Sequence, residues 1–194
     1  MGREFELKYR ATPEQLAQIQ RQYDGFATIR METTYYDAPS GILGRLHWTL
    51  RRRMENGVSV CTLKTNLPDG SRGEWEVHCE DVCEAVPQLI ALGAPGELAQ
   101  YTAGGVIPTC GARFTRQAAL VQSGDTLVEL ALDQGVLIGG GREAPLSEAE
   151  VELKQGRDTG AVQFAQQLAA RFGLTPEPKS KLRRALELAG IENR

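Results

Sequence analysis

Carboxylate and cationic side chains recur at every second position in several short segments of this chain. The first is EFELK at residues 4–8, in which Glu4, Glu6 and Lys8 alternate with apolar residues. Because successive side chains of a β-strand point to opposite faces, this spacing predicts a strand with one charged and one apolar face. Taken alone, such a strand is typical of the solvated edge of a sheet. The charge patterns of the other segments indicate whether this charged face belongs to a functional site.

Acidic residues line up again in two later segments, LVELALD at 127–133 and SEAEVELK at 147–154. Carboxylate oxygens are hard ligands of the kind that Mg²⁺ and Mn²⁺ take in proteins. We expect the first strand to form one wall of a metal site and the segment 147–154 the facing wall. The metal-ligand candidates are the carboxylates Glu4, Glu6, Asp133, Glu148, Glu150 and Glu152.

Two points about this metal site stay open. The sequence does not say which two of the three glutamates in 147–154 coordinate directly. Asp133 precedes Gln134 and Gly135, so it is equally well interpreted as a turn residue.

Five other segments supply cations, LRRR, CTLK, RGEWE, ARFTR and PKSKLRR, and in RGEWE Arg72 lies beside Glu74 and Glu76. Arginine offers forked donors and lysine a point charge, and both suit phosphate oxygens. The candidate phosphate-binding residues are therefore Arg51, Arg53, Lys64, Arg72, Arg113, Arg116, Lys179, Lys181 and Arg184. A chain that carries aligned acids and aligned bases predicts a site for an anion together with a metal ion.

Antiparallel strands must position these residues. Alternation and turn residues predict strands at 26–37, 46–55, 57–66, 71–79, 111–121, 125–133 and 146–155, besides the opening strand. Helical spacing predicts helices from Pro13 to about Asp24, after Asp81, and twice near the end, with stripes at 164–172 and 182–189. In a flat sheet the like charges of neighbouring strands would repel. A closed or nearly closed barrel with a polar interior and helices over its apolar outer face avoids this.

Composition narrows the class of protein. The chain has 194 residues, 41% of them hydrophobic, which predicts one domain over 1–194. A net charge of −3 argues against nucleic acid or a membrane surface as partner. Without a signal-peptide pattern or a long apolar run, we expect a cytoplasmic protein. The 4 cysteines form no CxxC pair and are expected to be reduced.

The order of the motifs resembles the CYTH superfamily, the triphosphate tunnel metalloenzymes, and in particular its bacterial inorganic triphosphatases. The matching motifs are Glu4-x-Glu6-x-Lys8, Tyr35-Tyr36-Asp37, Leu50-Arg51-x-Arg53, Leu63-Lys64, Arg72-x-Glu74, Glu148-x-Glu150-x-Glu152 and Lys179-Ser180-Lys181. One departure is Ala38, where the family often has threonine. The resemblance covers nearly the whole chain and implies an α+β fold with eight antiparallel strands forming a tunnel.

This resemblance implies metal-dependent hydrolysis of a triphosphate. We expect two ions, Mg²⁺ or Mn²⁺, and cleavage of inorganic tripolyphosphate to pyrophosphate and phosphate. Lys8, assisted by Tyr35 or Tyr36, is the candidate for deprotonating the attacking water. The alternative for Lys8 is an ion pair with Glu6 or Glu74.

The positions of the two tryptophans bear on the choice of substrate. Trp48 and Trp75 fall on strand faces opposite the charged residues, which leaves no evident aromatic platform for an organic group in the tunnel. Inorganic tripolyphosphate is therefore favoured. The alternatives are a thiamine triphosphatase, a class IV adenylate cyclase and a polyphosphate-binding module without turnover. The oligomeric state stays open, as does whether the chain is one module of a longer protein.

Overall fold

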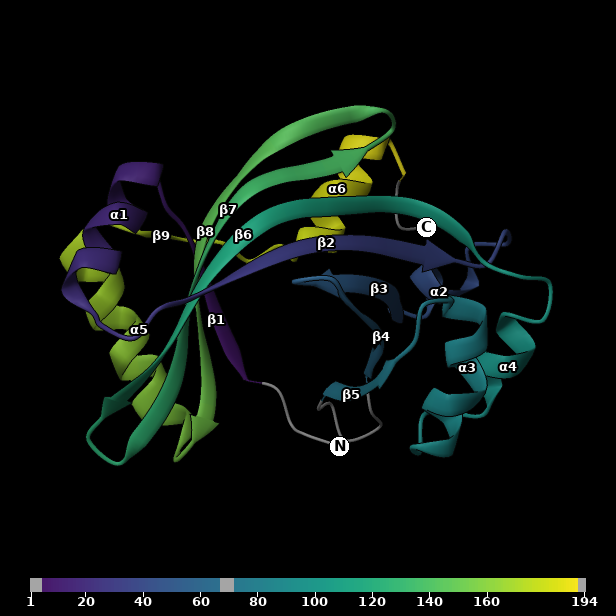
Figure 1. Ribbon diagram of the computed structural model, residues 1–194, viewed down its shortest axis with the longest axis horizontal. Helices are drawn as coiled ribbons and strands as arrows, with labels where there is room; N and C mark the ends of the chain where they lie inside the picture. The colour runs from purple at the N-terminus through teal and green to yellow at the C-terminus, as the bar shows by residue number, and fades with distance from the viewer. Residues whose placement is uncertain (1–4, 67–71, 192–194) are drawn as a thin grey trace.

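A single antiparallel sheet organises the chain. The structure, a computed structural model, describes residues 5–66 and 72–191, apart from the side chain of Arg72. The strands are β1 (Glu6–Arg10), β2 (Ala27–Asp37), β3 (Thr49–Glu55), β4 (Val58–Asn66), β5 (Arg72–His78), β6 (Ile107–Ser123), β7 (Thr126–Gly139), β8 (Arg142–Gln155) and β9 (Thr175–Pro176). They follow the order β5-β4-β3-β2-β6-β7-β8-β1-β9 and curve around an interior (Figure 1). The predicted α+β tunnel of eight strands is confirmed, with the two-residue β9 added at an edge.

The strand register places charges of neighbouring strands side by side on the inner face. Lys8 lies opposite Glu150, and Arg116 lies opposite Asp133. The expectation that the two acidic strands form facing walls is wrong, because β1 pairs directly with β8. Whether two strands are neighbours depends on the strand order of the sheet, and the residue pattern of a single strand does not reveal that order.

Six helices flank the sheet within the described residues. They are α1 (Pro13–Gln22), α2 (Ile42–Arg45), α3 (Val82–Ala91), α4 (Glu97–Tyr101), α5 (Asp158–Phe172) and α6 (Lys181–Ala189). The first begins as its sequence predicts, because Thr12 and Gln15 form a capping box: each side chain accepts a hydrogen bond from the other residue's backbone N–H. The single turn of α2 has no counterpart in the predicted elements. No helix in the described part of the chain is both long and apolar enough to span a membrane.

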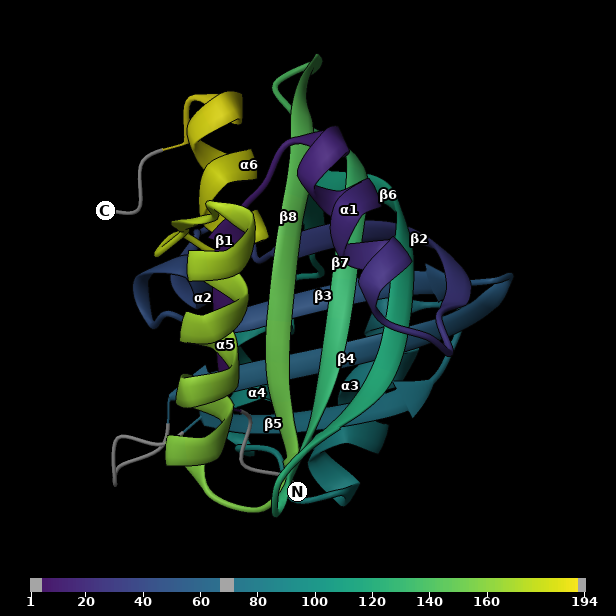
Figure 2. The same ribbon diagram turned by 90° about the vertical axis from the view of Figure 1, so that its left-hand side faces the viewer.

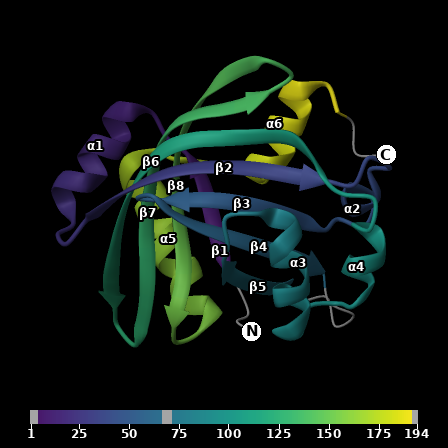
Figure 3. The same ribbon diagram turned by 45° about the vertical axis from the view of Figure 1, so that its right-hand side comes forward.

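Two apolar cores cover the outer face of the sheet. Helices α1 and α5 lie over β7, β8 and β1 (Figure 2), where Ile19 and Leu168 pack against Val151. Helices α3 and α4 lie beside β3, β4 and β5 (Figure 3), where Leu89 packs in the same cluster as Trp75. Burial of these side chains from water is the main force that holds the helices on the sheet. Trp75 thus faces away from the charged interior, as predicted.

Helix α6 packs on the inner face of the sheet, under the arch of β6, β7 and β8 (Figure 1). Its residues Ala185 and Leu186 share a core cluster with Met31 and Phe114, which also line the interior. A Cβ atom on Gly139 would collide with the carbonyl oxygen of Ala185, so glycine at the end of β7 admits the helix. The expectation that this last helix covers the apolar outer face is therefore wrong. An amphipathic stripe predicts that a helix is half-buried, but it does not reveal which face of the sheet the helix covers.

Candidate active site

A cavity of 340 Å³ lies inside the curved sheet. Acidic side chains line it from Glu6, Glu55, Glu74, Glu76, Glu129, Glu150 and Glu152. Basic side chains line it from Lys8, Arg51, Arg53, Lys64, Arg116, Lys154 and Lys181. Both signs of charge therefore face one space, which can receive a cation at one place and an anion at another.

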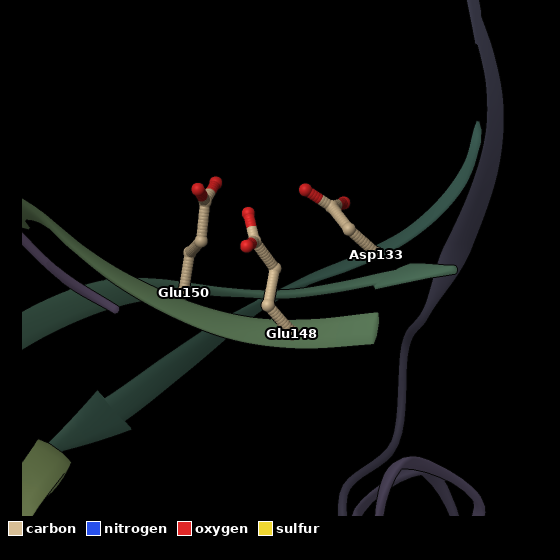
Figure 4. Close-up of side chains that lie close together, drawn as sticks. All are labelled: Asp133, Glu148 and Glu150. Carbon is tan, nitrogen blue, oxygen red and sulfur yellow. The ribbon is translucent and has the colours of Figure 1, made fainter. Parts of the chain in front are cut away.

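Three buried carboxylates form a cluster beside this cavity, and Glu150 is the one that lines it. Asp133, Glu148 and Glu150 each place one carboxylate oxygen within 4.8 Å of the others, and all three side chains project to the same side of β7 and β8 (Figure 4). Asp133 and Glu148 are 0% exposed. Asp133 lies opposite Glu148 in the middle of the β7–β8 ladder, so the alternative that it is a turn residue is wrong.

Lys181, at the start of α6, inserts its ammonium among these three acids. Its Nζ atom lies 2.8 Å from Asp133 Oδ2 and 2.7 Å from Glu150 Oε1, and it also pairs with Glu148. The lysine side chain is only 11% exposed. A tethered cation thus sits where the carboxylate oxygens converge.

Two arginines complete the charge balance of the cluster. Arg116 on β6 donates from Nε and Nη2 to the two oxygens of Asp133, at 2.8 and 2.7 Å, and also pairs with Glu150. Arg184, one turn after the start of α6, pairs with Glu148. Such forked, charge-assisted hydrogen bonds fix the orientation of the carboxylates.

The pKa values of the cluster follow from burial and these partners. Burial alone would raise the pKa of Glu150, but Lys181 and Arg116 outweigh it and hold that pKa well below its ordinary value. Burial raises the pKa of Glu148, and Lys181 offsets only part of this. Burial would lower the pKa of Lys181, yet the charges of the acids raise it. Glu150 and Lys181 therefore remain charged around neutral pH.

Arg51, Arg53 and Lys64 bring positive charge to the interior from β3 and β4. Lys64 Nζ lies 3.1 Å from Glu74 Oε1, and Arg51 Nη2 lies 3.5 Å from the same oxygen. Burial and the neighbouring charge of Arg51 lower the pKa of Arg53. Among the described residues, the Nε atoms of Arg51 and Arg53 are buried without a hydrogen-bond partner. Buried donors of this kind favour an anion that brings oxygen acceptors.

The three candidates for proton transfer occupy different places. Lys8 lines the cavity and its Nζ lies 3.2 Å from Glu6 Oε1, so the alternative of an ion pair with Glu6 is present in the structure. Tyr35 also lines the cavity, and burial raises its pKa, which keeps its hydroxyl protonated. Tyr36 packs against the outer core that contains Leu43. Neighbouring residues of one strand face opposite ways, so only one of the two tyrosines reaches the tunnel.

Other sequence candidates lie outside the cavity. Arg113 pairs with Glu143 and is 58% exposed, because its odd spacing from Arg116 turns it to the other strand face. Lys179 is 48% exposed and pairs with Glu187 on α6. Glu4 and the side chain of Arg72 fall outside the described residues.

Four further carboxylates line the cavity but are absent from the metal-ligand candidates named from the sequence, namely Glu55, Glu74, Glu76 and Glu129. Their signal was strand parity: Glu55 follows Arg53 by two residues, so it shares that inner face.

A second, mainly apolar pocket of 260 Å³ adjoins the tunnel. Tyr36 and Trp48 contribute its aromatic lining, and the Trp48 ring is held edge-on against Tyr101 with 5.6 Å between ring centroids. The pocket and the cavity share Tyr35, Thr49 and Leu182. Trp48 thus faces away from the tunnel, as predicted, yet lines a space next to it.

Comparisons with known proteins match nearly the whole chain to one protein family. A family model described as the CYTH domain matches residues 2–186. The inorganic triphosphatase of Haemophilus influenzae is 28% identical over 191 residues, which are 95% of this chain and 54% of that protein. The chain thus spans about half the length of this curated relative.

Solved structures share the fold. A Hippeastrum protein described as having a dominant triphosphatase activity matches with a TM-score of 0.66 and 17% identity over 95% of both chains. A Pyrococcus horikoshii protein matches with a TM-score of 0.63 and 21% identity over 95% of this chain and 99% of that one. At these identities the likeness is evidence for the fold alone.

Proposed function

The chain belongs to the CYTH domain family, and from this membership we propose that it hydrolyses inorganic tripolyphosphate to pyrophosphate and phosphate in a metal-dependent reaction inside the tunnel. One observation carries the proposal: a buried cluster of three carboxylates reaches the tunnel cavity through Glu150, and the same cavity is lined by arginines with buried donors that are unpartnered within the described part of the chain. A metal ion and a polyanion are the pair of ligands that such a lining complements.

The donor set fits Mg²⁺ or Mn²⁺. Asp133, Glu148 and Glu150 offer only hard oxygen atoms, close together and shielded from water, and we propose that they hold one ion. Glu6 and Glu152 lie opposite each other on β1 and β8 and are candidates for a second ion, together with Glu4. When bound, a divalent ion supplies charge neutralisation for the phosphate oxygens.

The remaining roles belong to side chains of the interior. We propose that Arg51, Arg53 and Lys64 bind the phosphate oxygens, which would satisfy the buried arginine donors. The ion pair with Glu6 keeps the Lys8 ammonium in place, and this favours a role in orienting the attacking water. Tyr35 offers a protonated hydroxyl as a further hydrogen-bond donor.

A substrate panel tests the proposal. Initial rates of phosphate release are measured with tripolyphosphate, ATP and thiamine triphosphate in the presence of Mg²⁺ or Mn²⁺, and the products are separated by chromatography. We expect the highest kcat/KM with tripolyphosphate, because Trp48 and Trp75 face away from the tunnel and neither ring can stack there on an added organic group. Binding of tripolyphosphate without turnover would instead identify a polyphosphate-binding module.

The apolar pocket favours a second candidate, hydrolysis or cyclisation of an organic triphosphate. An organic group could enter the pocket beside Trp48 while its phosphates reach Arg51 in the tunnel, since the two spaces adjoin. Trp48→Ala decides between the candidates. It should lower kcat/KM for ATP or thiamine triphosphate but leave tripolyphosphate hydrolysis unchanged if organic substrates use the pocket. Cyclic AMP as the dominant product of ATP would identify a cyclase.

A further inference from the structure

Glu177 is a fully buried carboxylate that none of the charged sequence motifs includes. It lies between β9 and α6, and its side chain is 0% exposed. It is absent from the lining of the tunnel cavity. Burying a carboxylate is costly unless other groups compensate its charge, so its partners indicate what it holds together.

The partners of Glu177 come from two sides. On the side of β1, Arg10 donates from Nε to Glu177 Oε2, and the backbone N–H of Glu177 donates to the carbonyl oxygen of Lys8 at 2.9 Å. On the side of α6, the backbone N–H of Lys179 donates to Glu177 Oε1 at 3.0 Å, and Arg184 Nη1 lies 3.7 Å from Oε2. One carboxylate thus joins an acid-bearing strand to the start of a helix.

The start of α6 places basic side chains at the acidic cluster. Ser180 caps the helix by accepting a hydrogen bond from the backbone N–H of Arg183 at 3.1 Å, and Lys181 follows at once. Lys181 and Arg184 lie one turn apart on α6 and both reach the acidic cluster. Arg184 lies between two buried carboxylates, Glu148 in the acidic cluster and Glu177 before α6.

We propose that Glu177 is a positioning residue, which ties the start of α6 to β1 and thereby fixes Lys181 and Arg184 at the acidic cluster. The inference rests on the proposed function for its kinetic consequence, because a displaced Lys181 ammonium alters how the tunnel holds a triphosphate. Its structural consequence, a fixed start of α6, does not depend on the substrate.

Hydrogen exchange of the full chain tests the structural part. In Glu177→Gln the amides of α6 should exchange about tenfold faster or more than in the unmutated protein, because a charge-assisted link is lost, while those of α3 stay unchanged. Glu187→Gln is the matched control, since Glu187 lies on α6 but pairs with Lys179 and Arg183 at the surface. Unchanged exchange of α6 in Glu177→Gln would overturn the proposal.

Arg10→Met provides a second route to the same test. The substitution removes a charged partner of Glu177. Because the Arg10 side chain is 62% exposed, its replacement should destabilise the fold less than a change at the buried carboxylate. The amides of α6 should again exchange faster than in the unmutated protein. An effect on α3 and α6 alike would indicate a general loss of stability and count against positioning.

A double-mutant cycle tests whether Glu177 acts through Lys181. KM for tripolyphosphate is measured for Glu177→Gln, Lys181→Met and the double variant at equal folded fraction. We expect Glu177→Gln to raise KM several-fold in the original background and to have no further effect once Lys181 is gone. Independent effects of the two substitutions would contradict positioning. If the unmutated protein does not hydrolyse tripolyphosphate, the proposed function fails, while the exchange experiment still decides the role of Glu177.

Discussion

Replacement of Lys181 by methionine removes a lysine that contacts all three acids of the buried cluster. The methionine keeps the length and much of the volume of the side chain but leaves Asp133, Glu148 and Glu150 with Arg116 and Arg184 as counter-ions. Breaking a buried pair by removing one partner costs about 3–5 kcal/mol. Because the two arginines stay, we take the lower limit, about 3 kcal/mol, for the metal-free protein. For a chain of 194 residues this lowers Tm by about 6–12 °C.

Divalent metal should reverse this loss. The Lys181 ammonium and a divalent cation draw on the same carboxylate oxygens, so the ion binds more tightly once the lysine is removed. At a free concentration of about 100 times Kd, an ion that binds only the folded state adds about 2.7 kcal/mol of stability. Mn²⁺ should therefore restore most of the Tm lost in Lys181→Met and raise the Tm of the unmutated protein less.

Thermal unfolding with and without Mn²⁺ measures both effects. Arg183→Met is the matched control, because Arg183 lies on the same helix and pairs only at the surface with Glu187 within the described interactions. A metal-free Lys181→Met protein as stable as this control would refute the role of the ammonium as a buried counter-ion. Equal Mn²⁺ shifts in all three proteins would refute its competition with metal.

Three further outcomes follow from particular contacts. Arg53→Met should raise KM for tripolyphosphate by about tenfold or more, the effect of a lost charged hydrogen bond, whereas Arg157→Met at the surface should not, as steady-state kinetics can check. Gly139→Ala should lower the free energy of unfolding by about 2 kcal/mol in a denaturant titration, because its Cβ would collide with α6. Burial alone would raise the pKa of Glu177, but Arg10, the backbone N–H of Lys179 and Arg184 together outweigh burial and lower that pKa. Its charge therefore stabilises the protein above the unfolded pKa of about 4.3, and the stability deficit of Glu177→Gln should vanish as pH falls through the lower folded pKa.

Strand parity made much of the tunnel predictable from the sequence. The alternation in EFELK and SEAEVELK places Glu6, Lys8 and Glu150 on the inner face, where the structure has them. The same rule, applied strictly, would have removed Tyr36 and Arg113 from the candidates, because each lies an odd number of residues from an inward-facing neighbour on its own strand.

Other features depended on contacts between distant segments. Gly135 resembles a turn residue, but it pairs with β6 and β7 continues through it. Glycine is required there because β6 passes so close that a Cβ atom would collide with the backbone of Arg113. Asp133 therefore lies within a strand. The packing of α6 inside the sheet, and the burial of Glu177 beneath it, follow from tertiary packing that no local pattern encodes.

Hydrolysis of tripolyphosphate under controlled metal concentration tests the central claim most directly. Phosphate release is followed for the unmutated protein and for Asp133→Asn, first in excess chelator and then across a titration of Mn²⁺ or Mg²⁺. We predict no turnover in chelator, turnover on addition of metal, and a shift of the Asp133→Asn titration to higher metal concentration, because one carboxylate charge of the cluster is lost. Undiminished hydrolysis in chelator, with removal of metal verified by elemental analysis, would contradict the account.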